Sequence, residues 1–169
     1  YIFATDHKIV GIQYAITAAF FMLTGLTLVL LMRWQLAYPG QPNPTLSWAS
    51  NENPFIPGGV IQPDFYNSLG AMHGTIMVFL AVVPMLVGAF GNYIVPLQIG
   101  AREMAFPKIN MLSFWLYAAG GLTMLLSFLL PEGPPNSGWT SYPPLSVFAA
   151  DGQTIWLIGM ALLINSALA

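Results

Sequence analysis

The sequence contains no cysteine. That absence excludes disulfide bonds, zinc ribbons and iron–sulfur clusters held by cysteine. Charge is also scarce, because Asp, Glu, Lys and Arg make up 6% of the 169 residues whereas hydrophobic residues make up 56%. So few charges cannot cover the surface of a soluble domain, and a net charge of -2 gives no basis for binding nucleic acid. The composition therefore predicts an integral membrane protein.

Long runs without charge predict the membrane spans. We expect helices over residues 9–36, 67–98, 109–130 and 153–169, joined by loops over 37–66, 99–108 and 131–152. From Lys8 to Arg33 a helix rises roughly 38 Å at about 1.5 Å per residue, enough to cross a hydrocarbon core of about 30 Å. The two long loops are rich in Pro, Gly, Asn and Ser, which break helices. We expect one all-α membrane domain over 1–169, incomplete because its fourth helix is truncated at Ala169.

The basic residues predict the orientation of these spans, since loops kept on the cytoplasmic side are enriched in Lys and Arg. Lys8, Arg102 and Lys108 fall on one side of the membrane. The opposite loops carry four acids and no base; the acids are Glu52, Asp64, Glu132 and Asp151. We therefore expect a cytoplasmic N-terminus in a lipid bilayer. Arg33 is the one exception.

A single histidine, His73, lies inside the uncharged segment from Leu69 to Leu97. An ionisable side chain in a membrane is costly and suggests a function. Its roles could be metal or haem ligation, proton relay, or hydrogen bonding to a neighbouring helix. Arg33, expected at a similar depth, could extend to the interface or hydrogen-bond an oxygen-bearing substituent of a cofactor held by His73.

Several strings along the chain carry a family resemblance. They are TDHK at 5–8, Arg33 followed by PG at 39–40, MHGTIMVF around His73, GNYIVPLQIGAREMAFPKIN, SFW at 113–115, and GWTSYPP at 138–144. With these strings the chain resembles subunit I of the haem-copper oxidases, the family of cytochrome c oxidase. The resemblance implies the first four transmembrane helices of a twelve-helix bundle, the fourth being truncated.

The resemblance also implies a function. It implies part of the catalytic subunit of a respiratory terminal oxidase, which transfers electrons from cytochrome c through a low-spin haem to an oxygen-reducing haem–copper site. The implied partners are the remainder of subunit I, subunits II and III, and cytochrome c, and the location is a bacterial inner membrane, with the mitochondrial inner membrane as the alternative. A quinol oxidase, a relative that reduces nitric oxide, and a non-redox membrane helix bundle remain alternatives.

The resemblance assigns roles to particular residues. His73 matches an axial ligand of the low-spin haem, which is haem a or b, and Arg33 matches an arginine at the haem edge or its formyl group. Tyr66 falls near the same haem, and Trp139 and Tyr142 match a loop close to the haem propionates. We expect no catalytic residue within this chain, because the ligands of the high-spin haem and copper lie outside it.

The resemblance also suggests a proton pathway, with Glu103 at its cytoplasmic mouth and Asn92 further inward. This chain departs from the family pattern at Met111, where a second asparagine is usual, and at Ile164 and Asn165, where a serine pair is common. Methionine cannot order water as an amide does. We therefore expect an altered or absent pathway. Gln35 replaces an acid that helps some members hold a cation, so no calcium or sodium site is expected.

Overall fold

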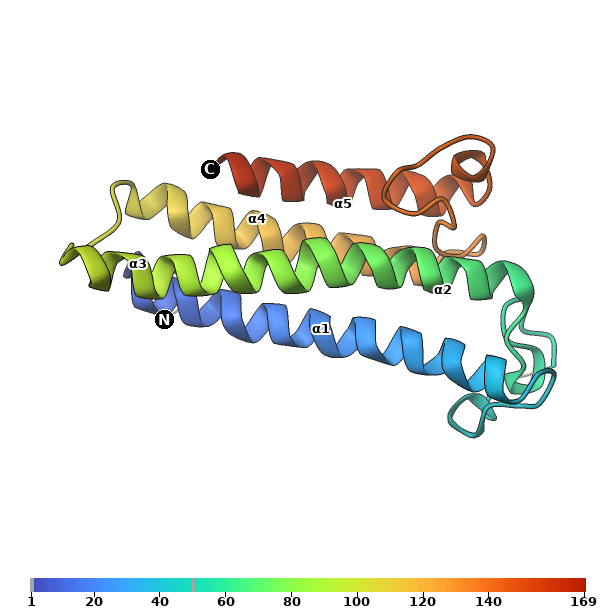
Figure 1. The fold of residues 1–169 in the computed structure, drawn as a ribbon. Coiled ribbons are helices and arrows are strands. Elements are labelled where there is room, and N and C mark those ends of the chain that lie inside the picture. Colours follow the sequence, from blue (N-terminus) through green and yellow to red (C-terminus); the bar gives the residue numbers. More distant parts are fainter. Residues whose placement is uncertain (1, 50) are drawn as a thin grey trace.

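The computed structural model describes residues 2–49 and 51–169, and the elements within that part are all helical (Figure 1). Helix α1 (His7–Ala37), a continuous helix over Pro63–Ile99, α4 (Pro107–Leu126) and α5 (Ala150–Leu168) lie alongside one another. The Pro63–Ile99 helix consists of α2 (Pro63–Thr75), the π-helical segments η3 (Ile76–Val82) and η4 (Pro84–Gly91), and α3 (Asn92–Ile99). Short 3₁₀ helices are η1 (Pro44–Leu46), η2 (Pro57–Gly59), η5 (Ser127–Leu129) and η6 (Leu145–Val147).

The helix ends follow local chemistry. Asp6 caps α1, because its Oδ1 accepts hydrogen bonds from the backbone N–H groups of Lys8 at 2.7 Å and Ile9 at 3.4 Å. Helix α2 begins at Pro63 rather than at the predicted residue 67. Proline suits the first helical position, and Asp64 in the first turn complements the helix dipole. Helix α5 likewise begins at Ala150 rather than residue 153.

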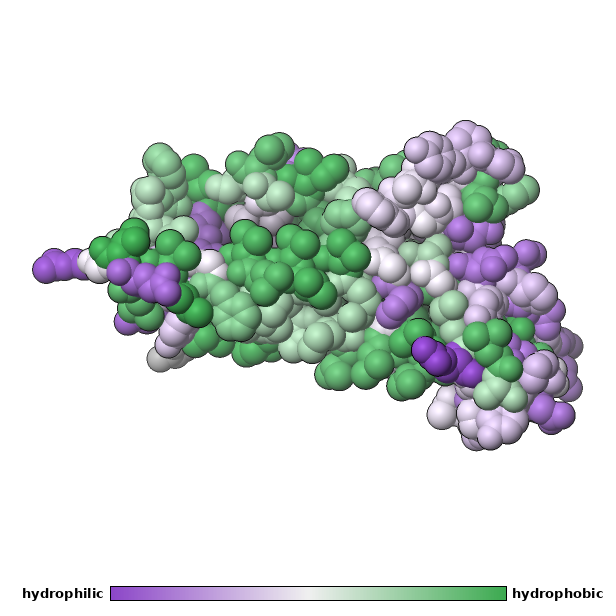
Figure 2. Space-filling view, viewed as in Figure 1, coloured by the Kyte–Doolittle hydropathy of each residue, from purple (hydrophilic) through white to green (hydrophobic). Residues whose placement is uncertain are grey.

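The fold is that of a multi-pass membrane protein, which confirms the predicted all-α membrane class. Within the described residues, three helices are long and apolar enough to cross a membrane: His7–Ala37, Pro63–Ile99 and Pro107–Leu129. The fourth predicted span forms α5, whose 19 residues include the polar Asp151, Gln153 and Asn165 and which therefore falls outside that group. Figure 2 shows apolar residues covering the helices and polar residues gathered at the ends of the bundle.

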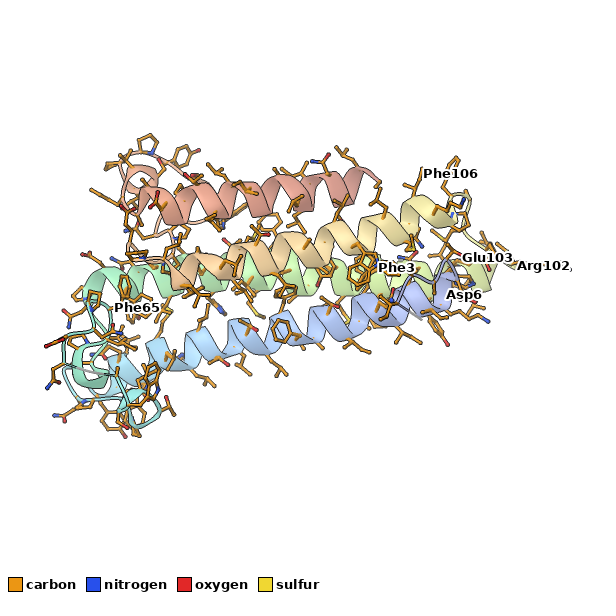
Figure 3. All side chains as sticks on the ribbon, turned by 180° about the vertical axis from the view of Figure 1, so that it is seen from behind. Phe3, Asp6, Phe65, Arg102, Glu103 and Phe106 are labelled. Atoms are coloured by element: carbon orange, nitrogen blue, oxygen red, sulfur yellow. The ribbon has the colours of Figure 1, made fainter. Side chains whose placement is uncertain are left out.

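The two ends of the bundle differ in the segments they carry. Asp6, Arg102, Glu103 and Phe106 lie at one end, with the turn between α3 and α4, whereas Phe65 lies at the other (Figure 3). The long segments before α2 and before α5 also lie at the second end (Figure 1). This arrangement puts the predicted cytoplasmic bases at a single end.

Helix α4 packs on α5 through glycine. A Cβ added at Gly120 would lie 2.8 Å from the carbonyl oxygen of Gly159, and one added at Gly159 would lie 2.7 Å from that of Gly120. Such short distances mean that the two backbones are in direct contact. Close approach through small residues is a common way for membrane helices to associate.

A proline, Pro84, lies inside the long helix, where the backbone forms an irregular turn. Pro84 has no N–H, so in α-helical geometry the carbonyl of Leu80 would receive no hydrogen bond from it. The hydroxyl of the buried Tyr117, on α4, donates to this carbonyl at 2.6 Å. The surrounding backbone is π-helical, a geometry that often marks irregular helical turns. Tyr117 thus adds an interhelical hydrogen bond to a carbonyl of the irregular turn that precedes Pro84.

Replacing Tyr117 with phenylalanine is expected to destabilise the protein by about 1 kcal/mol, because it removes one interhelical hydrogen bond in an apolar surrounding. The denaturation midpoint of the purified complete oxidase, measured in detergent, would show the loss. Thr123→Val on the same helix is the control, since the Thr123 hydroxyl donates to the Ala119 carbonyl of its own helix. Equal midpoints for the two variants would contradict this account of Tyr117.

Candidate functional site

The imidazole of His73 lies between α2 and α1. Its Nδ1 lies 2.8 Å from the backbone carbonyl oxygen of Gly25 on α1, and the side chain is half-buried. A carbonyl oxygen can only accept, so Nδ1 carries the proton and Nε2 of the neutral ring keeps its lone pair. Within the described residues, Nε2 has no hydrogen-bond partner. The ring is therefore oriented by α1 and presents a free nitrogen.

This arrangement fits an axial haem ligand. A ligating histidine almost always donates its second ring N–H to a carbonyl or carboxylate, as His73 does to Gly25. A Cβ added at the next residue, Gly74, would meet no atom within 4 Å, so the helix surface at Gly74 is open. The described residues contain no group of three or more His, Cys, Asp or Glu that could hold a metal ion. A haem iron needs only axial ligands from the protein.

Tyr66 and Arg33 lie between His73 and the end of the bundle that carries Phe65 (Figure 3). Tyr66 precedes His73 by seven residues on α2, hence on the same helical face, and is half-buried against the apolar core. Arg33 is exposed and follows Gly25 by eight residues, about 12 Å along α1 at about 1.5 Å per residue. The prediction that Arg33 and His73 share a depth was therefore wrong, because α1 passes His73 at Gly25. Arg33 makes no ion pair or hydrogen bond with the described residues.

Trp139 and Tyr142 lie in the segment between η5 and α5 and are 60% and 72% exposed. The ring of Trp139 lies 5.5 Å, centroid to centroid, from that of Phe79, which follows His73 by six residues on the Pro63–Ile99 helix. Trp139 thus contacts the helix that carries His73. Within the described part of the chain, neither Trp139 nor Tyr142 forms a hydrogen bond or ring contact with His73 itself.

The two predicted proton-pathway residues lie near one end of the bundle. Glu103 is exposed in the turn between α3 and α4 (Figure 3). Asn92 is 6% exposed; its Nδ2 donates to the Gly88 carbonyl at 2.7 Å, whereas its buried Oδ1 has no partner among residues 2–49 and 51–169. A buried amide oxygen without a partner is unusual and suits an ordered water.

Sequence reasoning missed a polar cluster close to Asn92. His7 is 2% exposed and its Nδ1 donates to the backbone carbonyl of Asn92 at 2.9 Å. Further inward, the hydroxyl of Tyr14 lies 2.8 Å from Oγ of Ser113, which donates to the carbonyl of Ser166 at 2.7 Å. Tyr14 follows His7 by seven residues and so shares its helical face, a signal that the sequence did contain. The pairing of Ser113 with Ser166 joins α4 to α5 and had no such signal.

These features define a class of protein: a multi-pass membrane helix bundle with an oriented imidazole between two helices. A family model described as Cytochrome C and Quinol oxidase polypeptide I matches residues 9–169. The chain belongs to this family.

Curated relatives agree with that assignment. The chain is 43% identical over 167 residues to cytochrome c oxidase subunit 1 of Thermostichus vulcanus, covering 98% of this chain and 27% of that protein. It is 38% identical over 167 residues to cytochrome c oxidase subunit 1 of a Synechocystis species, with the same coverages of 98% and 27%. It is also 38% identical over 166 residues to alternative cytochrome c oxidase subunit 1 of Bradyrhizobium diazoefficiens, covering 98% of this chain and 25% of that protein. The chain thus spans about a quarter of the length of these relatives.

Proposed function

We propose that this chain is the low-spin haem part of the catalytic subunit of a respiratory terminal oxidase. In this proposal His73 is an axial ligand of the low-spin haem, a or b, and the complete enzyme passes electrons from cytochrome c to an oxygen-reducing haem–copper site. The observation that carries the proposal is the His73 ring, whose Nδ1–H donates to Gly25 and whose Nε2 is free. The second axial histidine and the ligands of the high-spin haem and copper belong to the remainder of subunit I.

A bound low-spin haem would supply reversible one-electron transfer. The residues of this chain hold and tune that group. The bond to Gly25 fixes the plane of the His73 ring and raises the basicity of Nε2. Tyr66 lies on the same face two turns outward, and the indole N–H of Trp139 and the hydroxyl of Tyr142 are donors suited to haem propionates.

We propose that Glu103 collects protons from the cytoplasmic side and that these protons pass inward along Asn92. An exposed carboxylate at an aqueous mouth can bind protons, and the unpartnered Oδ1 of Asn92 supports an ordered water there. Met111 and Ile164 replace residues that are polar in the family and so supply no hydrogen bonds to water. The hydroxyls of Tyr14 and Ser113, which lie further inward, are the polar groups proposed to continue the path. The proposal covers proton supply and does not extend to pumping.

The proposed function also implies protein partners and a location for the complete enzyme. Subunits II and III and cytochrome c are the proposed protein partners, and a bacterial inner membrane is the proposed location. The grouping of Lys8, Arg102 and Lys108 at one end (Figure 3) supports a cytoplasmic N-terminus. A quinol donor stays as a second candidate, because the family description itself includes quinol oxidases.

The test is oxygen uptake by the purified complete oxidase, supplied in turn with reduced cytochrome c and with a quinol. The proposal expects uptake with reduced cytochrome c that His73→Ala abolishes. Oxygen uptake with the quinol but not with reduced cytochrome c would make a quinol the electron donor in place of cytochrome c. Reduction of nitric oxide without oxygen uptake, or the absence of haem from the purified protein, would overturn the proposed function.

In this proposal Arg33 lies at the haem edge, about two turns along α1 from the level of His73, and Arg33→Gln is expected to shift the visible band of the low-spin haem because it removes a permanent charge and its donors there. The band position in the reduced spectrum of the purified oxidase is the measurement. Lys8→Gln removes one positive charge at the opposite end of α1 and should leave the band in place. An unshifted band in Arg33→Gln would show that Arg33 does not lie at the haem edge.

A further inference from the structure

The segment between η5 and α5 is held by the first turn of α5. The backbone N–H of Asp151 donates to Oε2 of Glu132 at 3.1 Å. A Cβ added at Gly152 would overlap the carbonyl oxygen of Gly133, so these two backbones are in close contact. The start of α5 therefore fixes the beginning of the segment that carries Trp139.

Gln153, the next residue of α5, holds the middle of the same segment. The side chain is 5% exposed, and both polar atoms of its amide are used. Oγ of Ser137 donates to its Oε1 at 2.7 Å, and its Nε2 donates to Oγ of Ser141 at 2.8 Å. One buried side chain thus ties both ends of residues 137–141.

The backbone between these two ties is tightly turned. Gly138 has a φ of 66° and Ser141 has a φ of 53°, both in the left-handed region. A serine rarely adopts this conformation unless its surroundings impose it. The bond from Gln153 to the Ser141 hydroxyl is the contact that holds this residue in place.

Trp139 lies at the centre of the tied segment. Its ring lies 5.5 Å from that of Phe79, at an interplanar angle of 55°. Phe79 belongs to the same continuous helix as His73. The amide of Gln153 therefore sets where the Trp139 indole sits relative to the helix of the proposed haem ligand.

We propose that Gln153 is a positioning residue for the haem site, which acts by holding Trp139 against Phe79 through Ser137 and Ser141. This inference rests on the proposed function for its effect on the haem. The tie itself depends only on contacts within this chain. The two parts can be tested separately in one set of variants.

The first measurement is hydrogen exchange of residues 137–142 in the purified complete oxidase. Gln153→Leu removes both hydrogen bonds at similar side-chain size, and exchange of this segment is expected to become about 10-fold faster. Thr154→Val is the matched control, since the exposed Thr154 hydroxyl donates to the Ala150 carbonyl of its own helix. Unchanged exchange in Gln153→Leu would overturn the tie, whether or not a haem is bound.

The second measurement is the midpoint potential of the low-spin haem. Gln153→Leu and Trp139→Phe are each expected to shift it in the same direction, and the double variant to shift it no further than Trp139→Phe alone. An unshifted potential, or additive shifts, would overturn the positioning role while leaving the proposed function intact. If Gln153→Leu fails to assemble, Ser137→Ala combined with Ser141→Gly removes the same two bonds and suits the backbone at residue 141.

Discussion

Replacement of His73 by alanine is expected to abolish the visible band of the low-spin haem. Alanine has no metal-binding atom, and loss of one axial ligand leaves the iron without the pair of imidazoles that keeps it low-spin. The measurement is a reduced-minus-oxidised spectrum of membranes containing the complete oxidase at matched expression. This is the largest functional effect expected of any substitution in the chain, because His73 is the one side chain here proposed to bond iron.

The second histidine of the chain provides the control. His7→Ala also removes a histidine that donates to a backbone carbonyl, that of Asn92, but at the start of α1, where this helix contacts α3. Its haem band is expected to persist. A band lost from both variants would indicate general misfolding. A band kept at full amplitude in His73→Ala would show that His73 is not an axial ligand of the haem iron.

Gly120→Leu is expected to cost about 3 kcal/mol or more and to lower the yield of assembled oxidase. The added side chain begins with a Cβ that would lie 2.8 Å from the Gly159 carbonyl oxygen and 3.1 Å from the Leu163 backbone nitrogen. These are backbone atoms, so α5 as a whole must move, and overpacking of this kind is strongly destabilising. The denaturation midpoint of the purified oxidase, together with its yield, measures the effect.

Gly91→Ala is the control for this prediction, since a Cβ there would meet no atom within 4 Å. It is expected to be neutral or slightly stabilising, because alanine favours helix over glycine by up to about 1 kcal/mol. Comparable losses at Gly91 and Gly120 would contradict a special contact between α4 and α5.

The membrane class and the His73 candidate could be predicted from the sequence because each rests on local information. Uncharged segments of sufficient length identify the helices, and one histidine inside such a segment attracts attention without any knowledge of packing. Helix ends were harder to place, as Pro63 illustrates, because the preceding breaker-rich residues resemble loop.

Contacts between helices could not be predicted in this way. The depth of Arg33 relative to His73 depends on which residue of α1 faces the imidazole, and that is Gly25. The bond from Tyr117 to Leu80 and the ties from Gln153 to Ser137 and Ser141 join segments distant in sequence. Their donors and acceptors are ordinary residue types, so only the packed structure brings them together.

Imidazole rescue of His73→Gly tests the central claim most directly. The variant should lose the low-spin haem band, and added imidazole should restore it by entering the space left by the side chain and bonding the iron. An imidazole derivative with its ring nitrogens blocked should restore nothing. This result would establish that a nitrogen at this place ligates the haem, whereas a band that persists in His73→Gly without imidazole would contradict the account.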